Sequence, residues 1–225
     1  MKVCLKSVAA LAALAAFTAS GAAMAQSAHQ WTAEVGIGEV TPDVESGDVS
    51  APALPHTKAD IGSSTKPVFS ISYGLTDNWA VQLALGVPLK HELYGAGAIA
   101  GTGKLGSVKA LPPTALLQYR FGTPSSVLRP YVGAGATYAY FADETGSGQL
   151  TAITNTGSTP VSFEVDNKLC LSLQAGLTVN INERWFADFK MIKTRLRTQV
   201  HYSSGQQQDM RLDPKLVAVA IGYKF

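Results

Sequence analysis

The sequence predicts an all-β fold, an eight-stranded antiparallel transmembrane β-barrel. Three features of the 225-residue chain predict it. The chain begins with a short apolar segment typical of an export signal, later segments alternate apolar and polar residues, and the connections between those segments alternate between short and long. Strands with two different faces, joined by short turns at one end and long loops at the other, are typical of barrels that cross a membrane.

Residues 1–25 have the composition of a cleaved signal peptide. Lys2 and Lys6 flank the start of an uncharged apolar run at residues 8–19, and Ala23-Met24-Ala25 is a small-x-small cleavage site. The run is too short for a spanning helix, which needs about 20 apolar residues. Residues 26–225 would then form the mature barrel, and no later apolar run is long enough for a helical span.

Charge and cysteine content narrow the class of protein further. Loss of Lys2 and Lys6 would reduce the 18 basic residues to 16, equal to the 16 acidic ones. A neutral chain without a clustered basic face does not predict nucleic-acid binding. Cys4 would leave with the signal, so Cys170 would be the single mature cysteine and no internal disulfide is expected. A closed, hydrogen-bonded barrel would supply the missing stability.

The clearest alternating segment is residues 169–181, where apolar residues face one way and small or polar residues the other. Its 13 residues exceed the roughly five or six of a soluble strand, whereas a tilted membrane strand needs about 9–11. The same reasoning predicts eight strands. They are expected near residues 30–40, 65–75, 79–89, 107–121, 129–141, 167–181, 184–202 and 208–225.

The connections between these strands differ in length and composition. Residues 75–78, 122–128 and 180–183 are short, whereas 41–64, 90–106 and 142–166 are long and rich in Gly, Ser, Thr, Pro and Asp. Outer-membrane barrels have short periplasmic turns and long extracellular loops. Aromatic residues near strand ends, including Trp31, Trp79 and Trp185, are typical of the girdles at membrane interfaces. The cell outer membrane of a Gram-negative bacterium is therefore the expected location.

Alternation directs a set of polar side chains into the lumen. They are Glu34, Gln82, Gln118, Arg120, Gln174, Asp188 and Lys190. The interior of an eight-stranded barrel is only wide enough for side chains or one small ligand. These residues predict either a polar plug below a ligand pocket or an ion-pair network that simply fills the barrel, and the two are compatible. Buried charges must be paired in both cases.

Prolines interrupt the predicted fourth strand. Pro112 and Pro113 donate no hydrogen bond to a ladder, so the strand must bulge or lose pairing there. The break is either a lateral opening in the barrel wall or a strand end above the membrane. Lys90 and His91 follow the third strand, where contact with a ligand or lipid headgroup is one interpretation and an ordinary exposed loop is the other.

Two further groups of residues are candidates for binding or catalysis. Lys193, Arg195, Arg197 and Arg211 could contact lipopolysaccharide phosphates, or form a solvated strand face. His201 and Ser203 share one strand face, as the base and nucleophile of a serine hydrolase do, but no acid can be placed beside the histidine from sequence. An enzyme is not predicted. No cluster of metal ligands and no phosphate-binding or dinucleotide motif occurs, so no cofactor or metal is expected.

Short motifs along the mature chain carry a family resemblance. They are WTAEVG at 31–36, VPLKHE at 87–92, VKALPPT at 108–114, QYRF at 118–121, RPYVGAG at 129–135, INERW at 181–185, RLDP at 211–214 and GYKF at 222–225. Over almost its whole mature length the chain resembles the outer membrane protein W (OmpW) family. Lys215 departs from the family pattern, which often has Trp after that Asp-Pro.

The resemblance implies a narrow, largely apolar lumen that passes small hydrophobic molecules and opens sideways or outward. The alternative is a structural or surface-receptor barrel with a filled lumen, whose loops contact lipopolysaccharide or other partners. The C-terminus ends on Phe225, two residues after Tyr223. By resemblance to other outer-membrane barrels, this aromatic pair is the signal that the barrel-assembly machinery reads. Expected partners are therefore outer-membrane lipids and lipopolysaccharide, the assembly machinery and small hydrophobic solutes.

Overall fold

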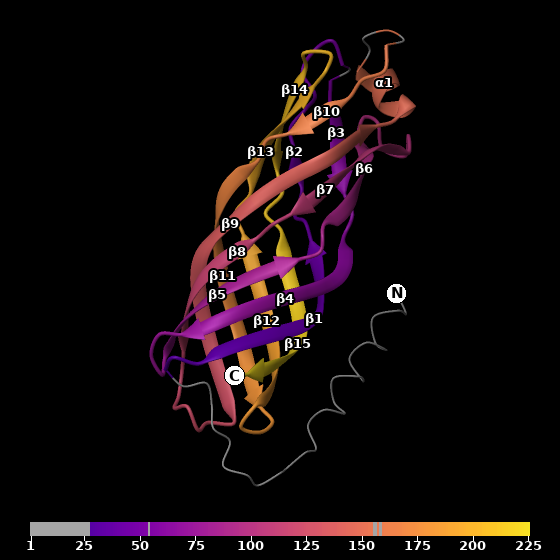
Figure 1. The fold of residues 1–225 in the computed structure, drawn as a ribbon. Coiled ribbons are helices and arrows are strands. Elements are labelled where there is room, and N and C mark those ends of the chain that lie inside the picture. Colours follow the sequence, from indigo (N-terminus) through magenta and orange to yellow (C-terminus); the bar gives the residue numbers. More distant parts are fainter. Residues whose placement is uncertain (1–27, 54, 155–156, 158) are drawn as a thin grey trace.

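Eight long strands form a closed antiparallel barrel (Figure 1). The computed structural model describes residues 28–53, 55–154, 157 and 159–225, and the predicted signal peptide lies outside the described residues. The barrel strands are β1 (Trp31–Thr41), β4 (Ser64–Gly74), β5 (Trp79–Gly86), β8 (Thr114–Arg120), β9 (Leu128–Gly146), β11 (Lys168–Asn180), β12 (Trp185–Thr194) and β15 (Lys215–Lys224). A ladder between β9 and β11 joins the two ends of the strand order and closes the ring. The predicted fold class is confirmed.

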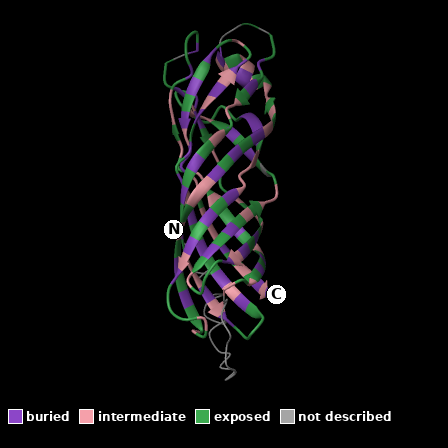
Figure 2. Ribbon diagram, turned by 60° about the vertical axis from the view of Figure 1, so that its left-hand side comes forward, coloured by how far each residue is buried: buried purple, intermediate pink, exposed green. Residues whose placement is uncertain are grey.

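The two faces of each barrel strand have opposite character (Figure 2). Along β11, Leu169, Leu171 and Leu173 are exposed on the outer face, while Ser172 and Gln174 are buried inside. Lipid offers no hydrogen-bond partner to the backbone, so only a closed ring of strands can present such an apolar face to it. The alternation of the sequence thus becomes an apolar outer surface around a polar lumen.

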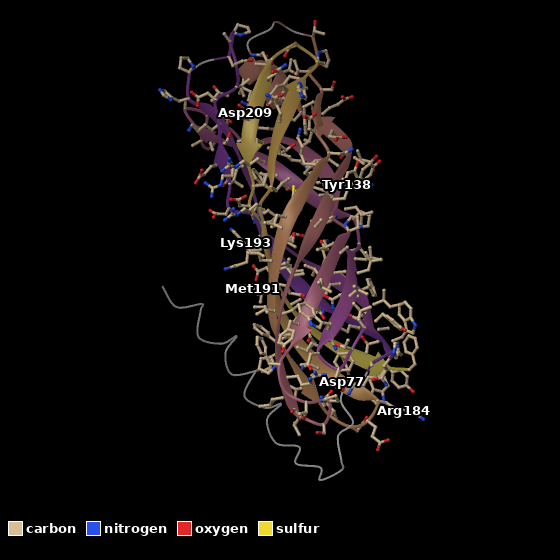
Figure 3. All side chains as sticks on the ribbon, turned by 90° about the vertical axis from the view of Figure 1, so that its left-hand side faces the viewer. Asp77, Tyr138, Arg184, Met191, Lys193 and Asp209 are labelled. Atoms are coloured by element: carbon tan, nitrogen blue, oxygen red, sulfur yellow. The ribbon has the colours of Figure 1, made fainter. Side chains whose placement is uncertain are left out.

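One end of the barrel, which we call the turn end, carries the short connections. The first barrel strand, β1, begins there and the last, β15, ends there. Residues 75–78, 121–127 and 181–184 join strands there, and the Trp31 amide donates to the Phe225 carbonyl at 3.2 Å. Aromatic side chains cluster on the outer surface at this end, with Trp79 and Trp185 each 5.0 Å from a tyrosine ring. Asp77 and Arg184 mark this end in Figure 3.

The opposite end continues as a two-sheet extension. The upper part of β9 pairs with β7 (Lys104–Leu111), followed by β6 (Leu89–Gly97) and β3 (Thr57–Ile61). The second sheet contains β10 (Phe163–Val165), β13 (Arg197–Tyr202), β14 (Gln207–Arg211) and β2 (Glu45–Ser46). The sheets bury an apolar core that includes Leu93, Leu105, Phe141, Phe163 and Val200. The helix α1 (Gly148–Thr154) adds Leu150 to this core.

Several predicted elements differ from the structure in the extension. The strands predicted at 107–121, 184–202 and 208–225 are each two strands, divided at residues 112–113, 195–196 and 212–214. The predicted third strand ends at Gly86 rather than at residue 89, and 90–106 is mostly the β6–β7 hairpin rather than a loop. The predicted loops 41–64 and 142–166 contain β2, β3, α1, β10 and the end of β9. Their composition resembles that of loops, but a shared apolar core orders them.

The described residues contain one helix, the seven-residue α1, and none that is long and apolar enough to cross a membrane.

Candidate functional site

A cluster of buried charges occupies the lumen. Lys190 of β12 donates to Glu34 of β1 and lies 3.2 Å from the Asp188 carboxylate. Ser70 donates to Glu34 at 2.8 Å, and the Tyr131 hydroxyl donates to Asp188 at 2.9 Å. Since a buried charge is costly unless it is paired and hydrogen-bonded, these contacts are what makes the cluster tolerable in a narrow barrel.

Three glutamines extend this cluster across the lumen. Gln118 of β8 donates to Gln82 of β5 at 3.0 Å and to Gln174 of β11 at 2.8 Å, and Gln174 donates to Gln82 at 2.9 Å. Arg120 donates to the remaining Gln118 oxygen at 2.8 Å. Strands β5 and β11 are not neighbours in the barrel, so the Gln82–Gln174 bond spans its interior. We call the charged cluster and the glutamines together the polar layer.

Two glycines leave room for the aromatic side chains that pack in the lumen. A Cβ on Gly176 would lie 2.3 Å from the Tyr131 ring, and a Cβ on Gly222 would lie 2.1 Å from the Phe186 ring. Phe186 is buried toward the turn end, and Lys224 lies 5.7 Å from the centre of its ring while donating to Asn180 at 2.7 Å. The turn end of the lumen is therefore filled by packed side chains.

A row of hydroxyls lies beside the polar layer. Thr114, Thr137, Ser172 and Thr194, from β8, β9, β11 and β12, form a chain of hydrogen bonds at 2.7, 2.6 and 2.7 Å. We call these four residues the hydroxyl row. Three of them line an apolar cavity of about 110 Å³, the wall cavity. Its apolar walls include Val40, Val68, Ile192, Leu196 and Leu216.

The wall cavity lies against the barrel wall formed by β4 and β5. Phe69 and Leu85 form a cross-strand pair on the outer face, where they are 44% and 42% exposed, and both also line the cavity. Residues of both faces of the wall therefore border this space.

The ladder of the wall is interrupted beside this cavity. The β5–β8 ladder ends at Ala84 opposite Thr114, and the β6–β7 ladder begins at Leu89 opposite Ala110. Within the described structure, residues 85–88 and 111–113 are not paired with each other across this break. Pro88, Pro112 and Pro113 supply no amide hydrogen for such pairing, and Pro112 lines the cavity.

The extension closes the lumen above the wall cavity. Ala139 and Leu196 line the cavity and also belong to the buried apolar core between the two sheets. The lumen thus has packed polar side chains toward the turn end, a small apolar cavity beside a break in the wall, and an apolar core beyond it.

This arrangement can be compared with known proteins. The sequence model of the OmpW family matches residues 30–225. The chain belongs to the OmpW family. Outer membrane protein W of Vibrio cholerae is 30% identical over 219 residues, which cover 96% of this chain and 97% of that protein. The crystal structure of OprG from Pseudomonas aeruginosa superposes with a TM-score of 0.80 at 28% identity and covers 90% of this chain and 98% of OprG.

A third relative is named after a metabolic operon. PahQ of Pseudomonas aeruginosa, a dibenzothiophene metabolism operon protein, is 26% identical over 199 residues, which cover 87% of this chain and 88% of PahQ. Membership of the family makes this chain an outer-membrane β-barrel that sits among lipids. Its turn end faces the periplasm and its extension faces outward, as in barrels of this class.

The structure places all seven predicted lumen residues inside the barrel, and joins all seven into the polar layer (they are Glu34, Gln82, Gln118, Arg120, Gln174, Asp188 and Lys190). Sequence reasoning missed Ser70, Tyr131 and the hydroxyl row. Ser70 and the hydroxyl row share the inward face of their strands, so the alternation could have found them. The contact of Tyr131 depends on the space left by Gly176, which no pattern along the chain reveals.

The basic residues and the C-terminal aromatic pair that the sequence singled out lie outside the lumen. Arg211 is paired with Glu45 at 2.9 Å and Asp213 at 2.6 Å, and Lys193 lies 3.5 Å from Asp43. Tyr223 and Phe225 lie at the end of β15 on the outer surface, with ring centres 6.4 Å apart. Figure 3 shows Met191 and Lys193 along the outside of β12.

The pair of His201 and Ser203 does not form the arrangement of a serine hydrolase. His201 lies 3.3 Å from the Asp166 carboxylate, but the Ser203 hydroxyl accepts from the Ser162 amide at 3.0 Å. In the described part of the chain, no hydrogen bond joins His201 to Ser203, although both have other partners. No group of three or more His, Cys, Asp or Glu residues that could hold a metal is found among the described residues.

The interpretation of His91 as an exposed loop residue is wrong. His91 lies in β6, is only 8% exposed, and has no hydrogen-bond partner for Nδ1 among the described residues. Burial lowers its pKa below the ordinary value, outweighing a raising hydrogen bond to the backbone of Gly62, and nearby Lys66 lowers it further. The sequence predicts a loop here, but the chain forms the β6–β7 hairpin, which buries this side chain.

Removing the central cation of the polar layer should destabilise the barrel strongly. Lys190→Met leaves the buried Glu34 and Asp188 carboxylates without their ammonium partner, and the expected loss is about 3–5 kcal/mol of unfolding free energy. Urea unfolding in lipid vesicles measures it. The matched control, Lys193→Met on the same strand, breaks an exposed pair and should cost about 0–1 kcal/mol. Equal losses in the two variants would contradict the assignment.

Acid should destabilise the folded extension through His91. The folded state binds this proton less readily than the unfolded chain, whose histidine titrates near the ordinary 6.5. The contribution of His91 to stability is therefore present above about 6.5 and is lost as the pH falls below it. An NMR titration of the His91 ring should give a midpoint below the ordinary value of 6.5. A midpoint at or above 6.5 would show that burial of the ring does not disfavour its charged form.

Proposed function

We propose that this barrel admits small hydrophobic molecules and releases them sideways into the membrane through the wall cavity. The observation that supports this most directly is that lumen-facing Ile192 and Leu216 share one apolar space with lipid-facing Phe69 and Leu85. In this proposal the break at Pro112 and Pro113 is the lateral opening, and the polar layer is a plug that closes the lumen toward the periplasm.

Desolvation energies favour this route over one along the barrel axis. An apolar solute is stabilised wherever it leaves water, so an apolar cavity open toward lipid offers a favourable path throughout. Passage through the polar layer would separate Gln82, Gln118 and Gln174 and leave buried polar groups unsatisfied. Each such group costs about 1–3 kcal/mol. An apolar solute could not compensate for these losses, because it offers no hydrogen bonds in return.

The cavity limits the size of the solute. Its volume of about 110 Å³ is close to that of engineered cavities of about 150 Å³ that bind benzene. One aromatic ring or a short alkyl chain would fit without rearrangement. The dibenzothiophene metabolism operon of the relative PahQ points to the same chemistry, because dibenzothiophene is a fused aromatic molecule without charge. Small movements of segments 85–88 and 111–113, which are not paired with each other, would admit larger solutes.

Filling the mouth of the cavity should stop uptake without harming the fold. Gly86 lines the cavity at the end of β5, and an added Cβ meets no atom within 4 Å. Gly86→Phe should therefore fit there and block the opening. The rate at which a neutral fluorescent naphthylamine enters bacterial cells expressing this variant should fall to the rate in cells that lack the protein.

The control uses a second glycine in open space. Gly148 at the start of α1 also has no atom within 4 Å of an added Cβ, but it lies in the extension away from the cavity. Gly148→Phe should leave uptake unchanged. Uptake that persists in a folded Gly86→Phe barrel, or that is absent from the unmodified protein, would contradict the proposal.

A receptor role is the second candidate, and one feature favours it. The extension has a cleft of about 1140 Å³ lined by charged residues of both signs, among them Lys58, Asp60, Arg197, Asp209 and Arg211. Such a surface suits sugars and phosphates, including those of lipopolysaccharide. Asp209 marks the region in Figure 3. Absence of uptake from a correctly folded barrel would put this role ahead.

We also propose two steps in the biogenesis of the barrel. Residues 1–25 would be removed on export, since they have the charged start, apolar run and small-residue cleavage site of a signal peptide. Tyr223 and Phe225 would then serve as the signal for the barrel-assembly machinery, because both lie on the outer surface at the end of the last strand.

A further inference from the structure

The wall cavity has an unbalanced charge. Its lining contains two lysines, Lys66 and Lys190, and no Asp or Glu. Lys190 reaches the Glu34 and Asp188 carboxylates in the polar layer. Lys66, in contrast, has no hydrogen bond or ion pair with any of the residues that the structure describes.

The position of Lys66 directs its side chain toward the lumen. On β4 it shares the inward face with Val68 and Ser70, while Phe69 and Ile71 are exposed on the outer face. In the β1–β4 ladder Lys66 lies opposite Gly38, which also lines the cavity. Lys66 is half-buried at this position.

We propose that Lys66 binds the carboxylate of a small hydrophobic acid whose apolar part occupies the wall cavity. This inference rests on the proposed function and names the preferred solute class, namely acids with one ring or a short alkyl chain. A lysine among apolar walls, with no protein anion beside it, gains a charge-assisted hydrogen bond from such a ligand. The threonine hydroxyls of the hydroxyl row provide further polar contacts on the cavity floor.

The cavity favours a small acid over a lipid phosphate. A phospholipid or lipopolysaccharide phosphate would meet basic groups on the outer face or the rim, where Lys193 and Arg195 are exposed to the surroundings of the barrel. Lys66 instead shares the lumen side of β4 with Val68. The limited volume beside it matches a molecule the size of benzoate better than a lipid headgroup with its chains.

Benzoate and its neutral relative benzyl alcohol test this assignment. The protein in phosphatidylcholine nanodiscs would be titrated with each probe while NMR follows the backbone amides of Gly38 and Gly86, both at the cavity. Benzoate should bind about tenfold more tightly than benzyl alcohol, as expected for a hydrogen bond between charged groups. Lys66→Met should abolish the preference, and Lys66→Arg should retain it.

The control variant is Lys90→Met, which removes an exposed lysine of β6 that does not line the cavity and should keep the preference. Equal binding of the two probes to the unmodified protein, or a preference that survives Lys66→Met, would overturn the inference and leave the proposed function standing. Binding of neither probe at Gly38 and Gly86 would count against the proposed function as well. Lys66→Arg keeps the test decisive if Lys66→Met fails to fold.

Discussion

A closed ring of eight strands leaves an interior that side chains can fill completely, and this constraint governs the rest of the structure. Polar groups directed inward must find their partners among the other side chains of the lumen. Lys190 therefore joins Glu34 of β1 and Asp188 of its own strand, and the Gln82–Gln174 bond crosses the lumen between strands that are not neighbours. The polar layer links β1, β5, β8, β11 and β12 from inside, in addition to the backbone ladders of the wall.

The constraint is relaxed where the wall is interrupted. Beyond the hydroxyl row the strands β5 and β8 separate, prolines replace amide donors, and the lumen becomes apolar beside Phe69 and Leu85. The two-sheet extension buries its own core directly above this cavity. The apolar space thus lies where the β5–β8 ladder ends, between two filled regions. In the proposed function, solutes leave through the wall beside this space.

The barrel could be predicted from the sequence, and the extension could not. Membrane strands such as 168–180 can be recognised by their length and strict alternation, because lipid on one side and lumen on the other favour different residues. Above the membrane both environments are mixed, so the β6–β7 hairpin has the composition of a loop and the burial of His91 leaves no sign in the sequence. The inward direction of Lys66 follows from the alternation of β4, but its lack of a partner depends on residues distant in sequence.

Ion conductance in planar bilayers tests most directly whether the polar layer seals the lumen. A barrel in which Gln82, Gln118 and Gln174 are all replaced by Ala should conduct ions, because the bonds that cross the lumen are lost. The unmodified barrel should show no steady conductance above that of the bare bilayer. A steady ohmic conductance of the unmodified protein, equal to that of the triple variant, would contradict the account.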